Sequence, residues 1–335
     1  MTEPAPLTLL TGFLGAGKTT LLNHLLRQPE LARTAVLVNE FGEIGLDHEL
    51  VQGVAGDTVL LAAGCLCCTV RGDLTRALDE LAPRVQSGEI ARVILETTGL
   101  ADPAPIIATL LGVPGLSSVF RLDGVVTVVD AVHAMAQIDA QFEALRQVAV
   151  ADRIVLTKTD LAEPADLSSR LAALNPTAPI LIADHGRVAP QALLDVGLFS
   201  TTGKQPDIAT WLAEAAFDAH GHHHHHHDVN RHDRHIHAFS LVFDTPLHWQ
   251  GFGMWLEMLA STQGPKLLRV KGIVDLEGQD RPVAINGIHS VFHPPELLQA
   301  WPDGQKRQSR IVFIVRDLTR ETVLRGLEAF EAAAM

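Results

Sequence analysis

Residues 11–20 read T-G-F-L-G-A-G-K-T-T and contain the pattern G-x-x-x-x-G-K-[ST], which is typical of a phosphate-binding loop. Its glycines let the backbone curl so that N–H groups face phosphate oxygens, and the helix that follows adds its positive end. The ammonium of Lys18 would contact the β- and γ-phosphates, and the hydroxyl of Thr19 would ligate Mg²⁺. The segment predicts a nucleoside triphosphate site whose contacts come from Gly12, Gly15, Ala16, Gly17, Lys18, Thr19 and Thr20.

All three cysteines of the chain lie between residues 65 and 68. A disulfide framework needs pairs that are spread through the fold, so Cys65, Cys67 and Cys68 are better suited to metal or redox chemistry. Thiolates favour Zn²⁺ or Co²⁺ over Mg²⁺, and a loop can turn two or three of them onto one cation. Glu40 and Glu43 are further candidate ligands of this ion or of the triphosphate's metal. The alternatives are thiols that only pack in the core and acids that only face solvent.

An apolar run ends at Glu96 and leads into Thr97-Thr98-Gly99. A strand that delivers a carboxylate beside a phosphate loop meets the requirement of a Walker B element, because the acid must be held near Mg²⁺. Gly99 would let the backbone approach the γ-phosphate. We therefore predict catalytic roles for Lys18 and Glu96 and a nucleotide contact at Gly99.

Residues 157–160 read T-K-T-D and close the sixth predicted strand, where GTPases carry their base-reading motif. Asp160 can accept two hydrogen bonds from guanine that adenine does not offer, and the stem of Lys158 can lie along the base. Thr157 stands where many GTPases have an Asn that supports the phosphate loop, and a Thr hydroxyl reaches less far. The motif predicts GTP as the nucleotide, whereas the alternative is a turn that only caps the next helix.

Residues 220–237 hold ten of the 17 histidines, six of them in succession from His222 to His227. Neutral imidazoles bind divalent ions at pH 7, so the segment can act as a weak and adaptable metal binder. A plain flexible linker is the alternative.

Composition narrows the class of protein. The net charge is −13, from 26 basic and 39 acidic residues, which argues against nucleic acid and anionic membranes as partners. Apolar runs stop well short of the ~20 residues of a membrane helix, and no basic segment precedes an apolar stretch at the start. We therefore expect a cytoplasmic protein. Its 335 residues, 47% of them hydrophobic, are enough for about two domains.

Short β-branched runs alternate with helical patterns through the first two-thirds of the chain, which predicts a parallel sheet covered on both faces. Expected strands are 7–11, 35–39, 58–62, 93–96, 125–130, 154–157 and 180–183, and expected helices are 18–26, 73–81, 103–111, 131–145 and 165–174. The fold class is α/β, with a doubly wound, mostly parallel P-loop domain at 1–213 and a His-rich linker at 214–236. Residues 237–335 follow the order β-α-β-β-β-α, which predicts a small α+β C-terminal domain.

The motifs G-F-L-G-A-G-K-T-T-L-L-N, N-E-F-G-E, G-C-L-C-C, E-T-T-G-L-A-D-P and T-K-T-D, followed by the His-rich stretch, strongly resemble the CobW-type metallochaperone GTPases. That family includes the zinc-regulated GTPase metalloprotein activators and is related to the nickel GTPases of urease and hydrogenase. The resemblance implies a CobW C-terminal domain, slow GTP hydrolysis, and a transition metal held by the Cys-x-Cys-Cys loop. By motif match, Mg²⁺ would lie at Thr19 and Glu96, guanine at Lys158 and Asp160, and the cargo metal at Cys65, Cys67 and Cys68.

The leading hypothesis is a GTP-gated carrier that uses Mg²⁺, binds Zn²⁺ or Co²⁺, and delivers it to a client metalloprotein. A homodimer that depends on nucleotide or metal is a further expectation. Zn²⁺ is preferred because it is the commonest partner of thiol sites. The alternatives are a cobalt-handling GTPase of cobalamin biosynthesis, a metal store with incidental nucleotide binding, and an ATP-dependent small-molecule kinase. Lys158 and Asp160 argue against the kinase.

Overall fold

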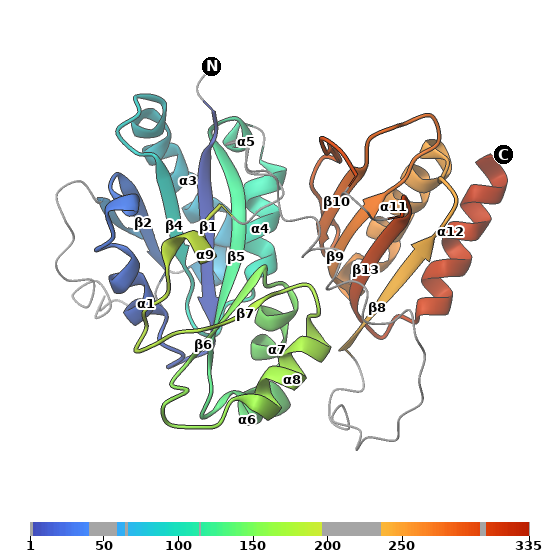
Figure 1. Cartoon of the computed structure of the whole chain (residues 1–335). Helices are drawn as coiled ribbons and strands as arrows, with labels where there is room; N and C mark the ends of the chain where they lie inside the picture. The colour runs from blue at the N-terminus through green and yellow to red at the C-terminus, as the bar shows by residue number, and fades with distance from the viewer. Residues whose placement is uncertain are drawn as a thin grey trace. The chain divides into compact units, whose positions relative to one another are not determined.

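The computed structural model describes residues 3–39, 59–63, 66–113, 115–195, 236–301 and 306–334, and for residues 39, 59–63 and 66–71 the backbone alone. The chain divides into two compact units, each built around its own sheet (Figure 1). Among the described residues, no helix combines the length and the apolar character that a membrane span requires.

A seven-stranded parallel sheet forms the first unit, in the order β3-β2-β4-β1-β5-β6-β7. From β1 the chain moves to β2 and β3 on one side, returns to β4 beside β1, and continues with β5 on the other side. Sheets of this kind bind ligands at the carboxyl ends of their strands, beside the strand where the order reverses. The strands are β1 (Ala5–Gly12), β2 (Thr34–Asn39), β3 (Val59–Ala63), β4 (Arg92–Glu96), β5 (Phe120–Asp130), β6 (Arg153–Thr157) and β7 (Ile180–Ile182).

All seven predicted strands are present, and the predicted α/β fold is confirmed. The largest shift is in β5, which begins at Phe120 because it pairs with β1 from Ala5 onward, with an irregularity between Leu7 and Thr8. The helices between residues 18 and 193 are α1 (Lys18–Leu25), η1 (Pro29–Leu31), α3 (Leu66–Gln86), α4 (Pro103–Gly112), α5 (Leu116–Val119), α6 (Ala134–Ala140), α7 (Phe142–Ala149), α8 (Ala165–Leu174) and α9 (Pro190–Leu193).

Two helices differ from their predicted ranges. α3 begins at Leu66, so Cys67 and Cys68 belong to its first turn, and the prediction of a loop was wrong for these two residues. The single helix predicted over 131–145 is instead two helices, α6 and α7, because Gln141 between them is extended, with φ −125° and ψ 115°.

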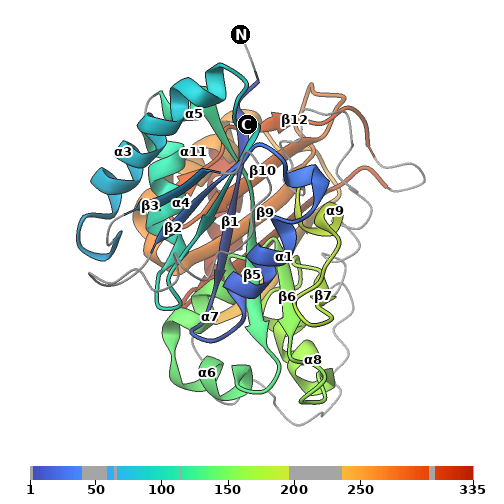
Figure 2. The ribbon, with the colours of Figure 1, turned by 90° about the vertical axis from the view of Figure 1, so that its left-hand side faces the viewer.

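The two faces of the sheet carry different helices. Figure 2 shows α3, α4 and α5 on one face and α1 on the opposite face. Leu21, Leu22 and Leu25 of α1 are buried in one core cluster with Val36 and Val128 of the sheet. This packing holds the first turn of α1, and therefore the phosphate loop that precedes it, against the sheet.

A second, antiparallel sheet with the strand order β11-β10-β9-β13-β8 and β12 paired to β10 forms the C-terminal unit. Its core packs Trp255 of α11, Leu327 of α12 and Phe313 of β13 together. The predicted α+β unit is thereby confirmed, whereas the domain boundaries stay a prediction because 196–235 lies outside the described residues. The elements are β8 (Ile236–Phe243), α11 (Trp249–Gln263), η3 (Gly264–Lys266), β9 (Leu267–Val274), β10 (Val283–Ile288), β11 (Val291–Phe292), β12 (Glu296–Leu297), β13 (Ser309–Arg316) and α12 (Arg320–Ala334).

Candidate functional site

The phosphate loop connects the carboxyl end of β1 to α1, and its conformation requires glycine. φ is +140° at Gly12, +73° at Gly15 and +95° at Gly17, values that L side chains rarely adopt. A Cβ atom at residue 12 would also lie 2.2 Å from the carbonyl oxygen of Val128. The glycines therefore permit the curled backbone that the motif predicts.

Lys18 is the first residue of α1, and only 8% of its surface is exposed. Its Nζ donates hydrogen bonds to the carbonyl oxygens of Gly12, at 2.9 Å, and Phe13, at 3.2 Å. A positive charge is thus held inside the loop, next to the N-terminal end of a helix. Both features favour an anion at this position.

Thr19 and Glu96 meet beside the loop. The Thr19 Oγ1 donates a hydrogen bond of 2.8 Å to Oε1 of Glu96, which is 4% exposed and ends β4. Register explains the meeting, because Glu96 pairs with Leu10 of β1, two residues before the loop. A hydroxyl and a buried carboxylate are the hard oxygen donors that Mg²⁺ prefers, so the pair fits the magnesium site that the sequence predicts.

Gly99 lies directly against the phosphate loop. A Cβ atom at this residue would be 2.5 Å from the backbone nitrogen and 2.7 Å from the Cα atom of Leu14. Any side chain would therefore push the segment away from the loop. The backbone after β4 reaches the phosphate loop only because residue 99 is glycine.

Two consecutive residues at the end of β6 hold the other side of the phosphate loop. Thr157 Oγ1 donates a hydrogen bond of 2.7 Å to the carbonyl oxygen of Ala16, and Lys158 Nζ donates one of 2.9 Å to that of Gly15. Although a threonine hydroxyl is expected to reach less far than an asparagine amide, the hydroxyl of Thr157 does reach and support the phosphate loop. Asp160 follows in an exposed turn.

Asp130, at the end of β5, is a site residue that the sequence reasoning missed. It is 2% exposed, and its Oδ2 accepts hydrogen bonds from Lys158 Nζ at 2.7 Å and from His133 Nδ1 at 2.9 Å. Burial acts to raise the pKa of Asp130, but the hydrogen bonds from Lys158, His133 and the Val132 N–H, with the charge of Lys158, outweigh it. The pKa of this carboxyl therefore lies below the ordinary aspartate range. A carboxylate that ends a predicted strand, as Glu96 does, was the signal in the sequence.

Residues 6–182 match the family model described as CobW/HypB/UreG, nucleotide-binding domain, and residues 236–331 match the cobalamin synthesis protein cobW C-terminal domain. The chain belongs to this family. The prediction made from the motifs is therefore confirmed.

Relatives of this CobW-family chain include the zinc chaperone YjiA of Escherichia coli, 36% identical, with 96% of this chain and 97% of the relative covered. The zinc-regulated GTPase metalloprotein activator 1 of Schizosaccharomyces pombe is 29% identical, with 97% and 82% covered. A crystal structure of the Zn(II)-bound YjiA GTPase from E. coli superposes with a TM-score of 0.73 at 30% identity and covers 98% of this chain and 99% of that one. The similarity extends over both units.

The predicted thiol site of this CobW-family chain lies partly outside the described residues, which exclude Cys65, Glu40 and Glu43. Cys67 and Cys68 lie in the first turn of α3, directly after β3. Because the sheet is parallel, this turn begins at the same edge as the phosphate loop, three strand spacings or about 14 Å from β1. Among the described side chains no group of three or more metal-ligating residues gathers.

A turn after β7 also borders the site. Residues 184–187 form a tight bridge from Asp184 to Arg187, and a Cβ atom at Gly186 would lie 2.8 Å from Cγ2 of Thr20. The turn therefore lies against the first turn of α1. Neither a motif nor unusual composition marks it in the sequence.

Proposed function

We propose that this chain binds GTP with Mg²⁺, hydrolyses it slowly, and uses the cycle to carry Zn²⁺ to a client metalloprotein. The family and the names of its relatives confirm the prediction of a GTPase with a metal-chaperone function. The single observation that carries the proposal is the hydrogen bond between Thr19 and the buried Glu96 beside the glycine loop. It supports a triphosphate with its metal at this edge of the sheet.

The phosphates are bound by the loop from Gly12 to Thr20, with Lys18 against the β- and γ-phosphates. Thr19 and Glu96 would hold Mg²⁺, which when bound offsets the negative charge that develops on the phosphates. Gly99 brings the backbone after β4 close to the γ-phosphate, which its contact with Leu14 supports. Lys18 and Glu96 are the catalytic residues of this proposal.

Guanine is the base that the remaining side of the site favours. Asp160 accepts hydrogen bonds from the N1–H and N2–H groups of guanine, and each bond to a charged acceptor is worth ~1.5–3 kcal/mol. Two such bonds favour GTP over ATP by a factor of a hundred or more. The Nζ of Lys158 is held for this role by two acceptors, the Gly15 carbonyl of the phosphate loop and the Asp130 carboxylate.

Zn²⁺ is the cargo that we propose for Cys65, Cys67 and Cys68, with Glu40 and Glu43 as further ligands of the cargo or of Mg²⁺. The zinc-named relatives support Zn²⁺ over Co²⁺. Since α3 starts at the sheet edge that carries the phosphate loop, a movement of this edge on GTP hydrolysis would reach the thiols. Hydrolysis is thereby linked to metal release.

The partners we propose are the client metalloprotein and a second copy of the chain, bound in a nucleotide- or metal-dependent way. Leu14 and Leu100 support a protein partner, because both are large exposed apolar side chains beside the Gly99 contact. Nucleic acid and membranes are not proposed as partners, given the net charge of −13. The cytoplasmic location expected from the sequence stays a prediction.

A titration of GTP binding with and without Zn²⁺ tests the carrier. Coupling between two sites is reciprocal, so Zn²⁺ should tighten GTP binding by roughly 5- to 150-fold, the same factor by which GTP tightens Zn²⁺ binding. The control, with Cys65, Cys67 and Cys68 all changed to Ala, should lose this coupling but keep its GTP affinity. Equal GTP affinity with and without Zn²⁺ in the unsubstituted chain would refute the carrier and favour a metal store. ATP binding as tight as GTP binding would refute the guanine site.

A further inference from the structure

The segment that follows Glu96 is tied to helix α7 by one buried side chain. Gln147 is 1% exposed, and its Nε2 donates hydrogen bonds to the carbonyl oxygens of Gly99, at 3.1 Å, and Ala101, at 3.0 Å. The backbone carbonyl of Gln147 in turn accepts a hydrogen bond of 2.7 Å from Thr127 Oγ1 of β5. One side-chain amide therefore connects the segment after β4 to a helix that is itself fixed to the sheet.

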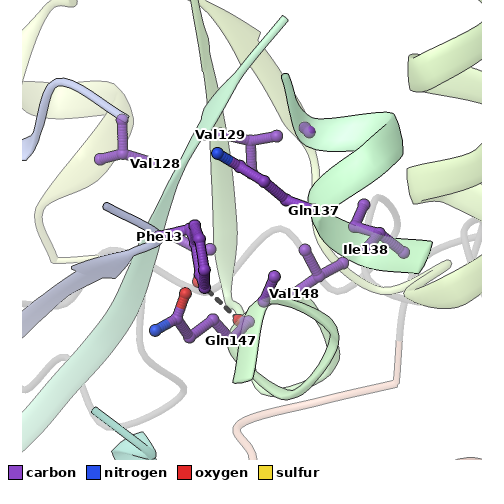
Figure 3. A pocket seen from close by; sticks show the side chains of 10 residues that line it. Phe13, Val128, Val129, Gln137, Ile138, Gln147 and Val148 are labelled. Carbon is purple, nitrogen blue, oxygen red and sulfur yellow. Dashed lines mark hydrogen bonds between the residues drawn. The ribbon is translucent and has the colours of Figure 1, made fainter. Parts of the chain in front are cut away.

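The oxygen of the same amide indicates that packing alone does not explain a glutamine at this position. Its Oε1 is buried and accepts no hydrogen bond within the described part of the chain. Gln147 also lines a small pocket together with Phe13, Val129, Ile138 and Val148 (Figure 3). A buried acceptor without a donor is unfavourable, whereas a leucine or methionine would fill this space without leaving such a group. The amide is thus explained by the two bonds that its nitrogen donates.

Those two bonds act on the part of the chain that lies on the phosphate loop. The Gly99 backbone is packed against Leu14, and the carbonyl of the same residue accepts from Gln147. Further along, Asp102 caps α4 by accepting from the Ala104 N–H at 3.0 Å, and Arg146, which precedes Gln147 in α7, is ion-paired with Asp102. α7 therefore holds the whole segment between Glu96 and α4.

We propose that Gln147 is a positioning residue for GTP hydrolysis. This role rests on the proposed function, in which Glu96 lies at Mg²⁺ and Gly99 lies at the γ-phosphate. Gln147 does not touch the nucleotide. It acts through the Gly99 carbonyl, keeping the Gly99 peptide and the Glu96 carboxylate in one position relative to the phosphate loop.

The position of Gln147 predicts a particular kinetic effect. GDP is held by the phosphate loop and by the Lys158 side of the site, neither of which bonds to Gln147, so GDP affinity should change by no more than about twofold on substitution. The γ-phosphate faces the Gly99 segment, and a displacement of about 1 Å there can cost up to about 100-fold in rate. A residue that only stabilises the fold would lower thermal stability without this separation of kcat from binding.

The test compares three variants in single-turnover GTP hydrolysis and GDP binding. Gln147→Met keeps the volume and removes both donated bonds, so kcat should fall roughly 10- to 100-fold while the Kd for GDP stays within about twofold. Gln137→Met is the matched control, since Gln137 lines the same pocket from α6. This control variant should hydrolyse GTP at the unsubstituted rate. Hydrolysis by Gln147→Met at the unsubstituted rate would overturn the inference.

Gln147→Glu provides a second readout, the pH dependence of kcat, which would not change if Gln147 only stabilised the fold. Its carboxylate would face two carbonyl oxygens in a buried position, which raises the pKa of the new acid, and only its protonated form can donate to one of them. Its kcat, divided by that of the unsubstituted chain, should therefore rise as the pH is lowered from about 8 to about 6. A flat ratio would contradict the inference even if Gln147→Met fails to fold. If the unsubstituted chain does not bind GTP, the proposed function is refuted instead.

Discussion

The ion pair between Asp130 and Lys158 offers the sharpest test of the base-binding side of the site. Asp130→Asn keeps the shape of the side chain and removes its charge, so Lys158 Nζ loses a charged partner at 2.7 Å while its bond to the Gly15 carbonyl remains. We expect weaker binding of both GTP and GDP. The ratio of the two affinities should stay the same, because the contact lies far from the γ-phosphate in the proposed site.

The expected magnitude follows from the kind of bond that is lost. A hydrogen bond to a charged group contributes ~1.5–3 kcal/mol and a neutral one ~0.5–1.5 kcal/mol. The side chain of Lys158 is 37% exposed, so solvent screening places the difference at the lower end. A loss of about 1 kcal/mol corresponds to roughly fivefold weaker nucleotide binding.

Competition of GDP and GTP against a fluorescent guanine nucleotide measures this effect, and a double-mutant cycle assigns it to the pair. In a Lys158→Met background, Asp130→Asn should have almost no further effect on affinity. The control is Asp123→Asn, a buried carboxylate in the same strand whose partners include Arg92 and Thr8, and it should lower stability without changing the affinity of the folded protein. Full additivity of the Asp130 and Lys158 substitutions would refute the reasoning.

Four further outcomes are expected. Thr157→Val should weaken GDP binding by about 1 kcal/mol through loss of the bond to Ala16, whereas Thr157→Ser, measured in the same titration, should not; equal losses in both would contradict this. Glu96→Gln should abolish the Mg²⁺-dependent release of phosphate from GTP, while GDP still binds when a chelator has removed Mg²⁺. Phosphate release at the unsubstituted rate would disprove the role of the carboxylate. Because the pKa of Asp130 is lowered in the fold, its stabilising effect is present above about pH 4 and is lost as the pH falls through that lowered value. Urea unfolding should therefore show a difference between the unsubstituted chain and Asp130→Asn that is constant near neutrality and shrinks only in acid. Stripping Zn²⁺ with a chelator should weaken GTP binding by the coupling factor, and no change would argue against a linked metal site.

Much of the site could be predicted from local pattern. The glycines, Lys18 and Thr19 are contiguous, and their spacing allows one backbone path, so the phosphate loop was placed without tertiary information. Glu96 was also found, because an acid at the end of a strand in a parallel sheet must reach the common carboxyl edge. The same argument applies to Asp130, which ends β5. The loop predicted from three thiols within four residues was wrong for Cys67 and Cys68, because α3 extends through both residues.

Other features of the site had no local signal. Gln147 lies in an ordinary amphipathic helix, 48 residues from the Gly99 carbonyl to which it donates. The turn at residues 184–187 reaches Thr20 only because β7 joins the far side of the sheet. Such contacts depend on which strands become neighbours and on their register.

The amino-acid sequence by itself determined the fold class, the family, and the kinds of chemistry at each strand end, because hydrophobic periodicity and motif spacing are properties of short segments. Tertiary structure alone decided that Thr157 and Lys158 support the phosphate loop, that Asp130 holds Lys158, and that Gln147 fixes Gly99. The physical reason is that a hydrogen bond between distant residues forms only where the sheet brings donor and acceptor within about 3 Å.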